Sequence, residues 1–369
     1  MNKSLKYVTY QTFPAKTANS LQTISNIKYL INNNVNVELY FPLRERQSSD
    51  SLAILQAEYK FSEKFILHGI KHSYLHGKVK FFKSFWYNLS HFLWSRKTVL
   101  KLFKNNKIDV FFTRSDWIAY FLAKQGSKVV FEIHQVSKIR NFVIKRIKNL
   151  ENIKLIFLNQ ELSRFYLSPT NSLVLHNGVD NSLYSNSIKN KINNHIINLG
   201  KLSRFNQPRG ISTIINWFKE KELKETFTLE IVGGNKKEVN ELNDLIHKLK
   251  LTSVVTVNSW VNRKEAIKKL EKASIGLLIN SSSNSHSKFY TSPLKYFEYL
   301  YAKLKIVAVD FPSHRALPLA DHIAFFNENN KESFINALQN LEEIGELSDK
   351  DLLSITIDSR VKKLIEFIF

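Results

Sequence analysis

The chain has 369 residues, 43% of them hydrophobic, and a formal net charge of +22 at pH 7. This length accommodates two domains that each have a core, and an apolar content that includes 27 phenylalanines excludes a disordered chain. The absence of cysteine excludes disulfides and thiolate metal sites. The first residues lack the apolar core of a signal peptide, and no apolar window is long enough for a membrane-spanning helix. We therefore expect a cytoplasmic protein that is soluble or bound peripherally to a membrane.

The first half alternates between strand and helix patterns, which is typical of a parallel sheet with helices on its faces. A helix is predicted at Ser20–Asn32, where apolar residues recur at helical spacing after the polar turn Pro14–Ser20. Backbone donors at the start of this helix are expected to be available to a ligand. Strands are predicted at Lys6–Gln11, Val37–Phe41, Asp109–Thr113, Lys128–Ile133, Leu155–Leu158 and Ser172–Leu175.

The second half repeats the alternation and predicts a second domain of the same kind. Strands are predicted at Ile196–Leu199, Phe227–Val232, Val254–Val257 and Ile275–Ile279, and helices at Ile211–Lys219, Glu238–Leu249 and Arg263–Lys272. Residues 280–292 are small and polar, which predicts a flexible, exposed loop. Residues 354–369 predict an amphipathic helix. We expect a linker between the two doubly wound α/β domains near Asn181–Lys191.

The positive charge is concentrated in the first half. Eleven Lys or Arg residues and a single acid, Glu63, lie between Lys60 and Lys107, interleaved with many aromatic residues. A second basic cluster comprises Lys138, Arg140, Lys145, Arg146 and Lys148. Basic and aromatic residues together favour an anionic membrane surface, but they also suit single-stranded nucleic acid. Alternatively, the aromatic residues belong to the core and the lysines to a solvated face.

The segment Ser292–Pro312 carries the strongest functional signal. It predicts a helix with Ser292 as N-cap and Pro293 at the first helical position, followed by a buried strand at Ile306–Val309. A helix start favours an anionic ligand. Glu298 lies one turn into the helix and off its apolar face, where a carboxylate suits a hydroxyl donor such as a ribose. An ordinary amphipathic helix followed by a core strand would look the same.

Two further segments carry residues that suit a nucleotide. In GKLSRFNQPRG, at 200–210, glycine and cations follow a predicted strand, so Lys201, Arg204 and Arg209 could neutralise a diphosphate. They could equally be surface cations of a lysine-rich chain. In FEIHQ, at 131–135, Glu132 and His134 end a strand, where open α/β sheets bind ligands.

In this order, SPLKYFEYLYAKLKIVAVDFP, GKLSRFNQPRG, the turn HNGVD (His176–Asp180) and the strand LEIVGG (Leu229–Gly234) resemble the family-4 retaining glycosyltransferases. The Asn-Gly pair of HNGVD predicts a tight turn with positive φ. The resemblance implies a GT-B fold, in which two Rossmann-like domains face each other across a cleft and the C-terminal helix crosses back to the first domain. It thus implies a first domain at 1–184 that includes 354–369, and a nucleotide-sugar-binding domain at 185–353.

The resemblance also implies roles for individual residues. Catalytic roles are implied for His134, Lys201 and Arg209. Donor-binding roles are implied for Gly200, Arg204, Gly233, Tyr290, Thr291, Ser292, Pro293, Leu294 and Glu298. Roles on the acceptor side or in the cleft are implied for Lys16, Thr17, Asn19, Arg114, Glu132 and Asn177. Neither a cofactor nor a metal is implied, because cations neutralise the leaving diphosphate.

The chain departs from the family pattern at three positions. Tyr290 stands where the family has the first of two glutamates, which puts the usual contact to the donor sugar in question. Lys303 and Lys305 replace the expected Gly and Pro after the helix.

The predicted function is therefore a retaining, metal-independent hexosyltransferase that uses a UDP- or GDP-type sugar. The acceptor is predicted to be a lipid-linked or surface glycan, as in capsule, O-antigen or lipopolysaccharide assembly, at an anionic membrane surface on the inner face of the cell membrane. A diacylglycerol glycosyltransferase and a GT-B nucleotide-sugar epimerase remain alternatives. A nucleic-acid-binding protein is a third alternative, which the ordered motifs disfavour.

Overall fold

The computed structural model describes residues 3–15, 17–72, 82–103, 110–167, 169–184, 191–204, 207–208 and 210–369. Lys16, Arg209 and the side chain of Arg204 lie outside this description, as do parts of the basic stretch and of the predicted linker. The chain forms two compact units. Unit 1 comprises Met1–Leu175 and Val361–Phe369, and unit 2 comprises His176–Arg360.

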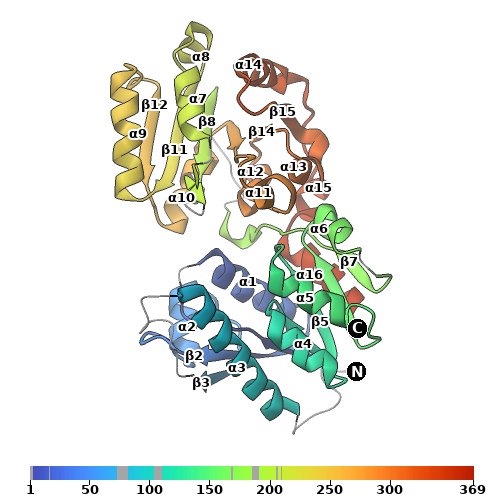
Figure 1. Ribbon diagram of the computed structural model, residues 1–369. Helices are drawn as coiled ribbons and strands as arrows, with labels where there is room; N and C mark the ends of the chain where they lie inside the picture. Colours follow the sequence, from blue (N-terminus) through green and yellow to red (C-terminus); the bar gives the residue numbers. More distant parts are fainter. Residues whose placement is uncertain are drawn as a thin grey trace. The chain divides into compact units, whose positions relative to one another are not determined.

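Unit 1 contains a seven-stranded parallel sheet with the strand order β3-β2-β1-β4-β5-β6-β7 (Figure 1). The strands are β1 (Lys3–Val8), β2 (Val35–Leu43), β3 (Ile66–Lys71), β4 (Val110–Thr113), β5 (Lys128–Ile133), β6 (Ile153–Phe157) and β7 (Ser172–Val174). All pairings between neighbours are parallel. The predicted parallel sheet is confirmed, but β3 was not predicted, since it lies inside the basic stretch and lacks a run of β-branched residues.

The helices of unit 1 connect successive strands. They are α1 (Ala18–Asn32), α2 (Leu52–Tyr59), α3 (Lys83–Phe103), α4 (Asp116–Lys124), α5 (Lys138–Ile147) and α6 (Gln160–Phe165). At the start of α1, the Thr17 hydroxyl accepts from the Ser20 N–H at 3.1 Å, and the Ser20 hydroxyl accepts from the Thr17 N–H at 3.1 Å. This capping box uses donors that the sequence led us to expect free for a ligand.

Unit 2 contains a six-stranded parallel sheet with the order β12-β11-β8-β13-β14-β15. The strands are β8 (His195–Leu199), β11 (Thr228–Gly234), β12 (Val255–Ser259), β13 (Ile275–Leu278), β14 (Lys305–Val309) and β15 (Ile323–Phe326), and β9 (Ser203–Arg204) and β10 (Gln207–Pro208) form a small hairpin. The helices are α7 (Ile211–Trp217), α8 (Lys221–Thr226), α9 (Lys236–Lys248), α10 (Arg263–Lys272), α11 (Ser285–Phe289), α12 (Leu294–Tyr301), α13 (Pro312–Arg315), α14 (Lys331–Gln339) and α15 (Asp349–Ser354). In Figure 1, α9 lies along β11 and β12. This strand order is that of a doubly wound Rossmann sheet, as predicted.

Helix α12 is buried more completely than its sequence pattern indicates. Tyr296, Phe297 and Tyr299 are each fully buried, and Glu298 is only 8% exposed, so the expectation that Glu298 points off the buried face is wrong. The side chain of Tyr299 also covers Gly276 of β13, where an added Cβ would lie 2.3 Å from the ring. The glycine therefore allows α12 to approach the sheet closely.

The start of α12 also differs from the prediction. The N-cap is Pro293 rather than Ser292, and no side chain caps the helix. The preceding polar segment is not an uncovered loop, because it contains α11 and buries Ser287. The Ser313 hydroxyl donates to the carbonyl of Ser287 at 3.0 Å, which ties α11 to α13.

The last helix, α16 (Ile357–Ile368), ends in unit 1. The Lys154 ammonium of β6 donates to the Phe367 carbonyl at 2.6 Å. Val361, Leu364, Ile365 and Ile368 are buried, as the predicted amphipathic pattern requires. The return of the C-terminal helix to the first domain is thus confirmed, although the helix begins at Ile357 and a separate helix, α15, precedes it.

Candidate functional site

The carboxyl ends of the strands in unit 1 bring together four residues that the sequence singled out. The order of the sheet reverses between β1 and β4, and ligands of open α/β sheets bind at this kind of reversal. Arg114 directly follows β4, Glu132 lies near the end of β5, and His134 directly follows β5. Asn19 lies in the first turn of α1.

Glu132 is the centre of this group and is fully buried. Its Oε1 lies 2.8 Å from Arg114 Nη2 and 2.5 Å from His134 Nε2. Arg114 Nη1 donates to Asn19 Oδ1 at 2.9 Å and to Gln22 Oε1 at 3.2 Å. Gln22 has no signal in the sequence, because a helical glutamine is ordinarily a surface residue.

The protonation of His134 follows from these neighbours. Burial, and then the Arg114 guanidinium, lower the pKa of His134 to about 4, although the Glu132 carboxylate opposes this shift. The imidazole is therefore neutral at pH 7. Because a carboxylate only accepts hydrogen bonds, Nε2 carries the proton and Nδ1 is an acceptor. The arrangement can accept a hydrogen bond from a hydroxyl but does not supply a positive charge.

Arg140 supports the same group, which corrects its assignment to a basic surface cluster. Its side chain is buried, its Nε donates to Asp116 Oδ1 at 2.6 Å, and its Nη2 donates to the Arg114 carbonyl at 3.2 Å. The charge of Arg140 is thus used inside unit 1 to hold the backbone of Arg114. Thr17 is exposed and acts as the cap of α1.

In unit 2, two predicted glycines meet at the carboxyl ends of adjacent strands. Gly200 and Gly233 have φ angles of 110° and 119°, which favour glycine. A Cβ at Gly233 would lie 2.6 Å from the Gly200 carbonyl oxygen, and the Gly200 N–H donates to the Val232 carbonyl at 2.8 Å. Lys201 follows directly and is exposed. The result is a backbone turn without side chains and with a cation at its edge, next to the reversal of the sheet between β8 and β13.

The HNGVD turn is tied to the start of α12. Asn177 Nδ2 donates to the Ser292 carbonyl at 2.6 Å, and the Asn177 N–H donates to Ser292 Oγ at 3.3 Å. Neither Asn177 nor Gly178 has the positive φ that we predicted. Instead, Gly178 lets the turn pass close to residues 356–357, where a Cβ would lie 2.8 Å from the Thr356 carbonyl carbon. The turn thereby positions Thr291, Pro293 and Leu294 at the mouth of α12, with Tyr290 as the C-cap of α11.

Glu298 forms an ion pair with Arg263, the first residue of α10. The side chain of Arg263 is 42% exposed and that of Glu298 is 10% exposed. One carboxylate oxygen of Glu298 is thus already bound by Arg263, a partner that the sequence did not reveal because the two residues are distant in the chain.

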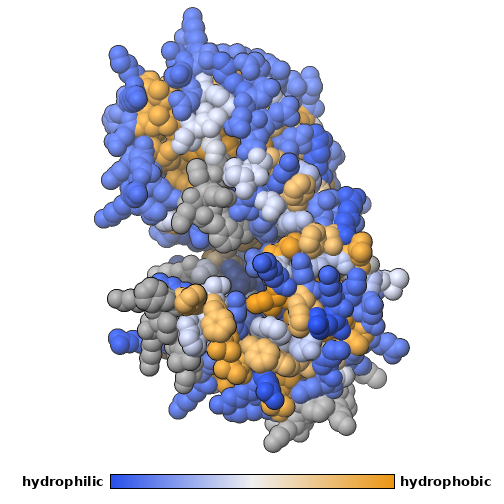
Figure 2. Space-filling view, viewed as in Figure 1, coloured by the Kyte–Doolittle hydropathy of each residue, from blue (hydrophilic) through white to orange (hydrophobic). Residues whose placement is uncertain are grey.

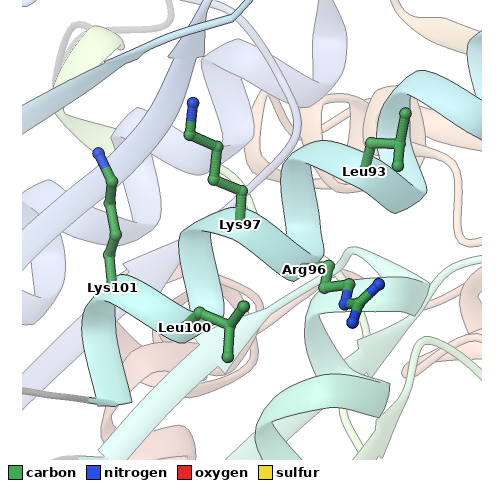
Figure 3. A pocket seen from close by; sticks show the side chains of 5 residues that line it. All are labelled: Leu93, Arg96, Lys97, Leu100 and Lys101. Atoms are coloured by element: carbon green, nitrogen blue, oxygen red, sulfur yellow. The ribbon is translucent and has the colours of Figure 1, made fainter.

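Helix α3 carries an exposed face that is apolar and basic. Leu93 and Leu100 are each half exposed, and with Arg96, Lys97 and Lys101 they line a shallow groove of about 330 Å³ (Figure 3). The groove floor is formed by the leucines, while Lys97 and Lys101 extend to one side of the helix and Arg96 to the other (Figure 3). Figure 2 shows apolar side chains gathered on this face of unit 1 with basic residues among them. No acid occurs in α3, whereas Trp94 on its other side belongs to the core.

Within the part of the chain that the structure describes, no helix has the length and apolar character needed to cross a bilayer. The same residues contain no cluster of three or more histidines and carboxylates suited to a metal ion.

Comparison with solved structures identifies the fold as GT-B. A glycosyltransferase from Rickettsia africae superposes with a TM-score of 0.69 at 14% identity, covering 100% of this chain and 98% of that one. A lipopolysaccharide outer core galactosyltransferase gives 0.69 at 11% identity, with 99% of each chain covered. An Escherichia coli trehalose-6-phosphate protein bound to UDP-2-fluoro glucose gives 0.68 at 12% identity, again with 99% of each covered. No family model and no curated protein sequence matches the chain.

Proposed function

We propose that this chain is a retaining glycosyltransferase that transfers a hexose from a nucleotide-diphosphate sugar. The observation that carries the proposal is the bare glycine turn of Gly200 and Gly233, which leaves room for a diphosphate at the carboxyl ends of β8 and β11. Several proteins of the same fold were solved with UDP or a UDP-sugar analogue. In unit 2 the predicted residues at the mouth of α12 would hold the sugar and ribose.

In this proposal the residues divide the work by charge. Lys201, with Arg204 and Arg209, stabilises the leaving diphosphate, which is the largest charge to develop in the reaction. Glu298 holds the ribose through the carboxylate oxygen that Arg263 leaves available. His134 in unit 1 accepts a hydrogen bond from a sugar hydroxyl through Nδ1. The leaving phosphate itself takes the proton of the acceptor hydroxyl, so that no pair of catalytic carboxylates is required.

Calorimetric titration with UDP, GDP and ADP tests the donor site. One diphosphate should bind selectively, and Lys201→Ala should weaken it about ten- to a hundred-fold, since a charge-assisted contact contributes roughly 1.5–3 kcal/mol. Lys237→Ala is the matched control, because Lys237 is an exposed lysine of α9 in the same unit. If no diphosphate binds, or if both variants bind alike, the donor site is assigned wrongly.

The proposed acceptor is a lipid-linked or surface glycan presented at an anionic membrane. The exposed face of α3 supports this part of the proposal, because its leucines can enter the headgroup region while its cations attract anionic lipid at about 1 kcal/mol each. The test is co-sedimentation with vesicles that contain phosphatidylglycerol. Replacing Arg96, Lys97 and Lys101 by Gln should lower the partition coefficient roughly a hundred-fold. Replacing Lys236, Lys237 and Lys248 of α9 should have little effect, and equal losses would contradict the role of α3.

A further inference from the structure

Unit 1 contains a second polar group, which the sequence analysis did not single out. Tyr10 follows β1, Arg44 directly follows β2, and His72 directly follows β3. Since parallel strands end at the same edge of a sheet, these three residues share the edge at which ligands bind. Tyr87 and His91 reach the group from α3.

The contacts within the group are close. The Arg44 guanidinium lies 4.5 Å from the centre of the Tyr10 ring and 5.8 Å from that of Tyr87. The Tyr10 ring stacks on His91 with centroids 4.4 Å apart, and the Tyr10 hydroxyl lies 3.0 Å from His72 Nε2. A guanidinium, an imidazole and a phenol thus converge around one tyrosine.

The charge of this group is positive and largely buried. The Arg44 side chain is 12% exposed, and its ion pair with Glu45 is long, at 3.6 Å. Burial and then the charge of Arg44 lower the pKa of His72 to about 4 and that of His91 to about 3, so both rings are neutral at pH 7. A shielded cation surrounded by neutral rings strengthens the attraction for an anion, because little water screens it.

Two buried donors or acceptors in the group are unsatisfied. Among the described residues, His91 Nε2 and Trp94 Nε1 have no hydrogen-bond partner, and the two side chains are 8% and 2% exposed. Trp94 contacts the Tyr10 ring at 5.5 Å between centroids. An unsatisfied buried polar group costs about 1–3 kcal/mol, and it is tolerated most readily where a ligand is to be bound.

We propose that Tyr10, Arg44, His72 and His91 form a subsite for a phosphate group of the acceptor. The inference deepens the proposed function, on which it rests, by assigning an anionic acceptor. A phosphate suits the group better than a carboxylate does. The guanidinium fork, the phenol and the imidazoles offer more donors than two carboxylate oxygens can use, whereas a phosphate presents at least three acceptors or directions.

The experiment follows the ring resonances of the histidines by NMR in the full chain, selectively labelled at histidine. The His72 and His91 signals are assigned from their loss in His72→Gln and His91→Gln. Inorganic phosphate should shift both signals, and Arg44→Met should weaken this binding at least about ten-fold. Arg46→Met is the matched control, because Arg46 lies two residues further in the same loop and is exposed.

Two additional arms make the result specific. Lys201→Ala in unit 2 should leave the phosphate-induced shifts unchanged, so that a failed donor site and a failed phosphate subsite are told apart. Vesicles of phosphatidylglycerol, compared with phosphatidylcholine, show whether a lipid headgroup supplies the phosphate; shifts with free phosphate alone assign a soluble or glycan-linked phosphate. If Arg44→Met does not fold, Arg44→Lys keeps the charge without the fork and should bind with intermediate affinity. Unchanged histidine signals with both probes, or equal losses in the Arg44 and Arg46 variants, would overturn the proposal.

Discussion

The buried carboxylate of Glu132 allows a quantitative test of the group at the end of β5. Arg114→Met keeps the length of the side chain but removes the charge 2.8 Å from the carboxylate. Breaking a buried ion pair from one side costs about 3–5 kcal/mol, because the remaining charge stays desolvated. We expect a loss of this size in the free energy of unfolding of unit 1 at about pH 8.

At lower pH the loss should shrink, because His134 can replace the missing cation. Arg114 holds the pKa of His134 down, whereas Glu132 raises it. Without Arg114, the folded-state pKa should therefore rise above the unfolded value near 6.5. A raised pKa adds stability that is complete below the unfolded pKa and is lost as the pH rises through the folded pKa. The difference between variant and wild type should thus be smaller at about pH 5.5 than at about pH 8.

The assay is urea unfolding followed by tryptophan fluorescence in a Trp217→Phe, Trp260→Phe background. The remaining tryptophans all lie in unit 1, so the signal reports this unit. The control is Arg114→Met with Glu132→Gln, which also removes the orphaned carboxylate and should recover most of the lost stability. If the double variant is as unstable as the single one, or if the loss does not depend on pH, the carboxylate is not the cause and our reasoning is refuted.

Two predictions concern unit 2. Gly178→Ala forces a Cβ against the backbone of Thr356 and should lower the free energy of unfolding by about 1–3 kcal/mol in thermal or urea unfolding, whereas Gly345→Ala, which meets nothing within 4 Å, should change it little. His314 is fully buried, and burial lowers its pKa to about 4, so unit 2 should lose stability as the pH falls from about 6.5 to about 4, by up to roughly 3 kcal/mol. In His314→Gln this part of the acid sensitivity should disappear; a curve parallel to that of the wild type would contradict the assignment.

The alternation of strands and helices could be predicted because each buried strand carries its own apolar run. The bounds of β5 and α10 were predicted to the residue, and Glu132 and His134 were placed correctly at the end of β5. Gly200 and Gly233 were also singled out, although only the structure shows that one approaches the backbone of the other.

What could not be predicted depends on partners that are distant in the chain. Glu298 is expected to be exposed from the local pattern, but Arg263 allows its burial. Arg140 looks like one of several surface cations until Asp116 is found beside it. The group around Tyr10 had no signal for a similar reason, because its members are contributed by three strand ends and a helix, and each of them is an unremarkable residue in its own segment.

The division of the chain has a consequence for the order in which the protein folds during synthesis. Unit 2 is continuous in sequence, but unit 1 needs Val361–Phe369, which the ribosome adds only after all of unit 2 has been made. Until then, Lys154 lacks the carbonyl of Phe367, and the surface that Val361 and Leu364 cover stays exposed to water. The unit that is synthesised first is thus completed last, and its unfinished surface is where a nascent chain would be most prone to bind chaperones or to aggregate.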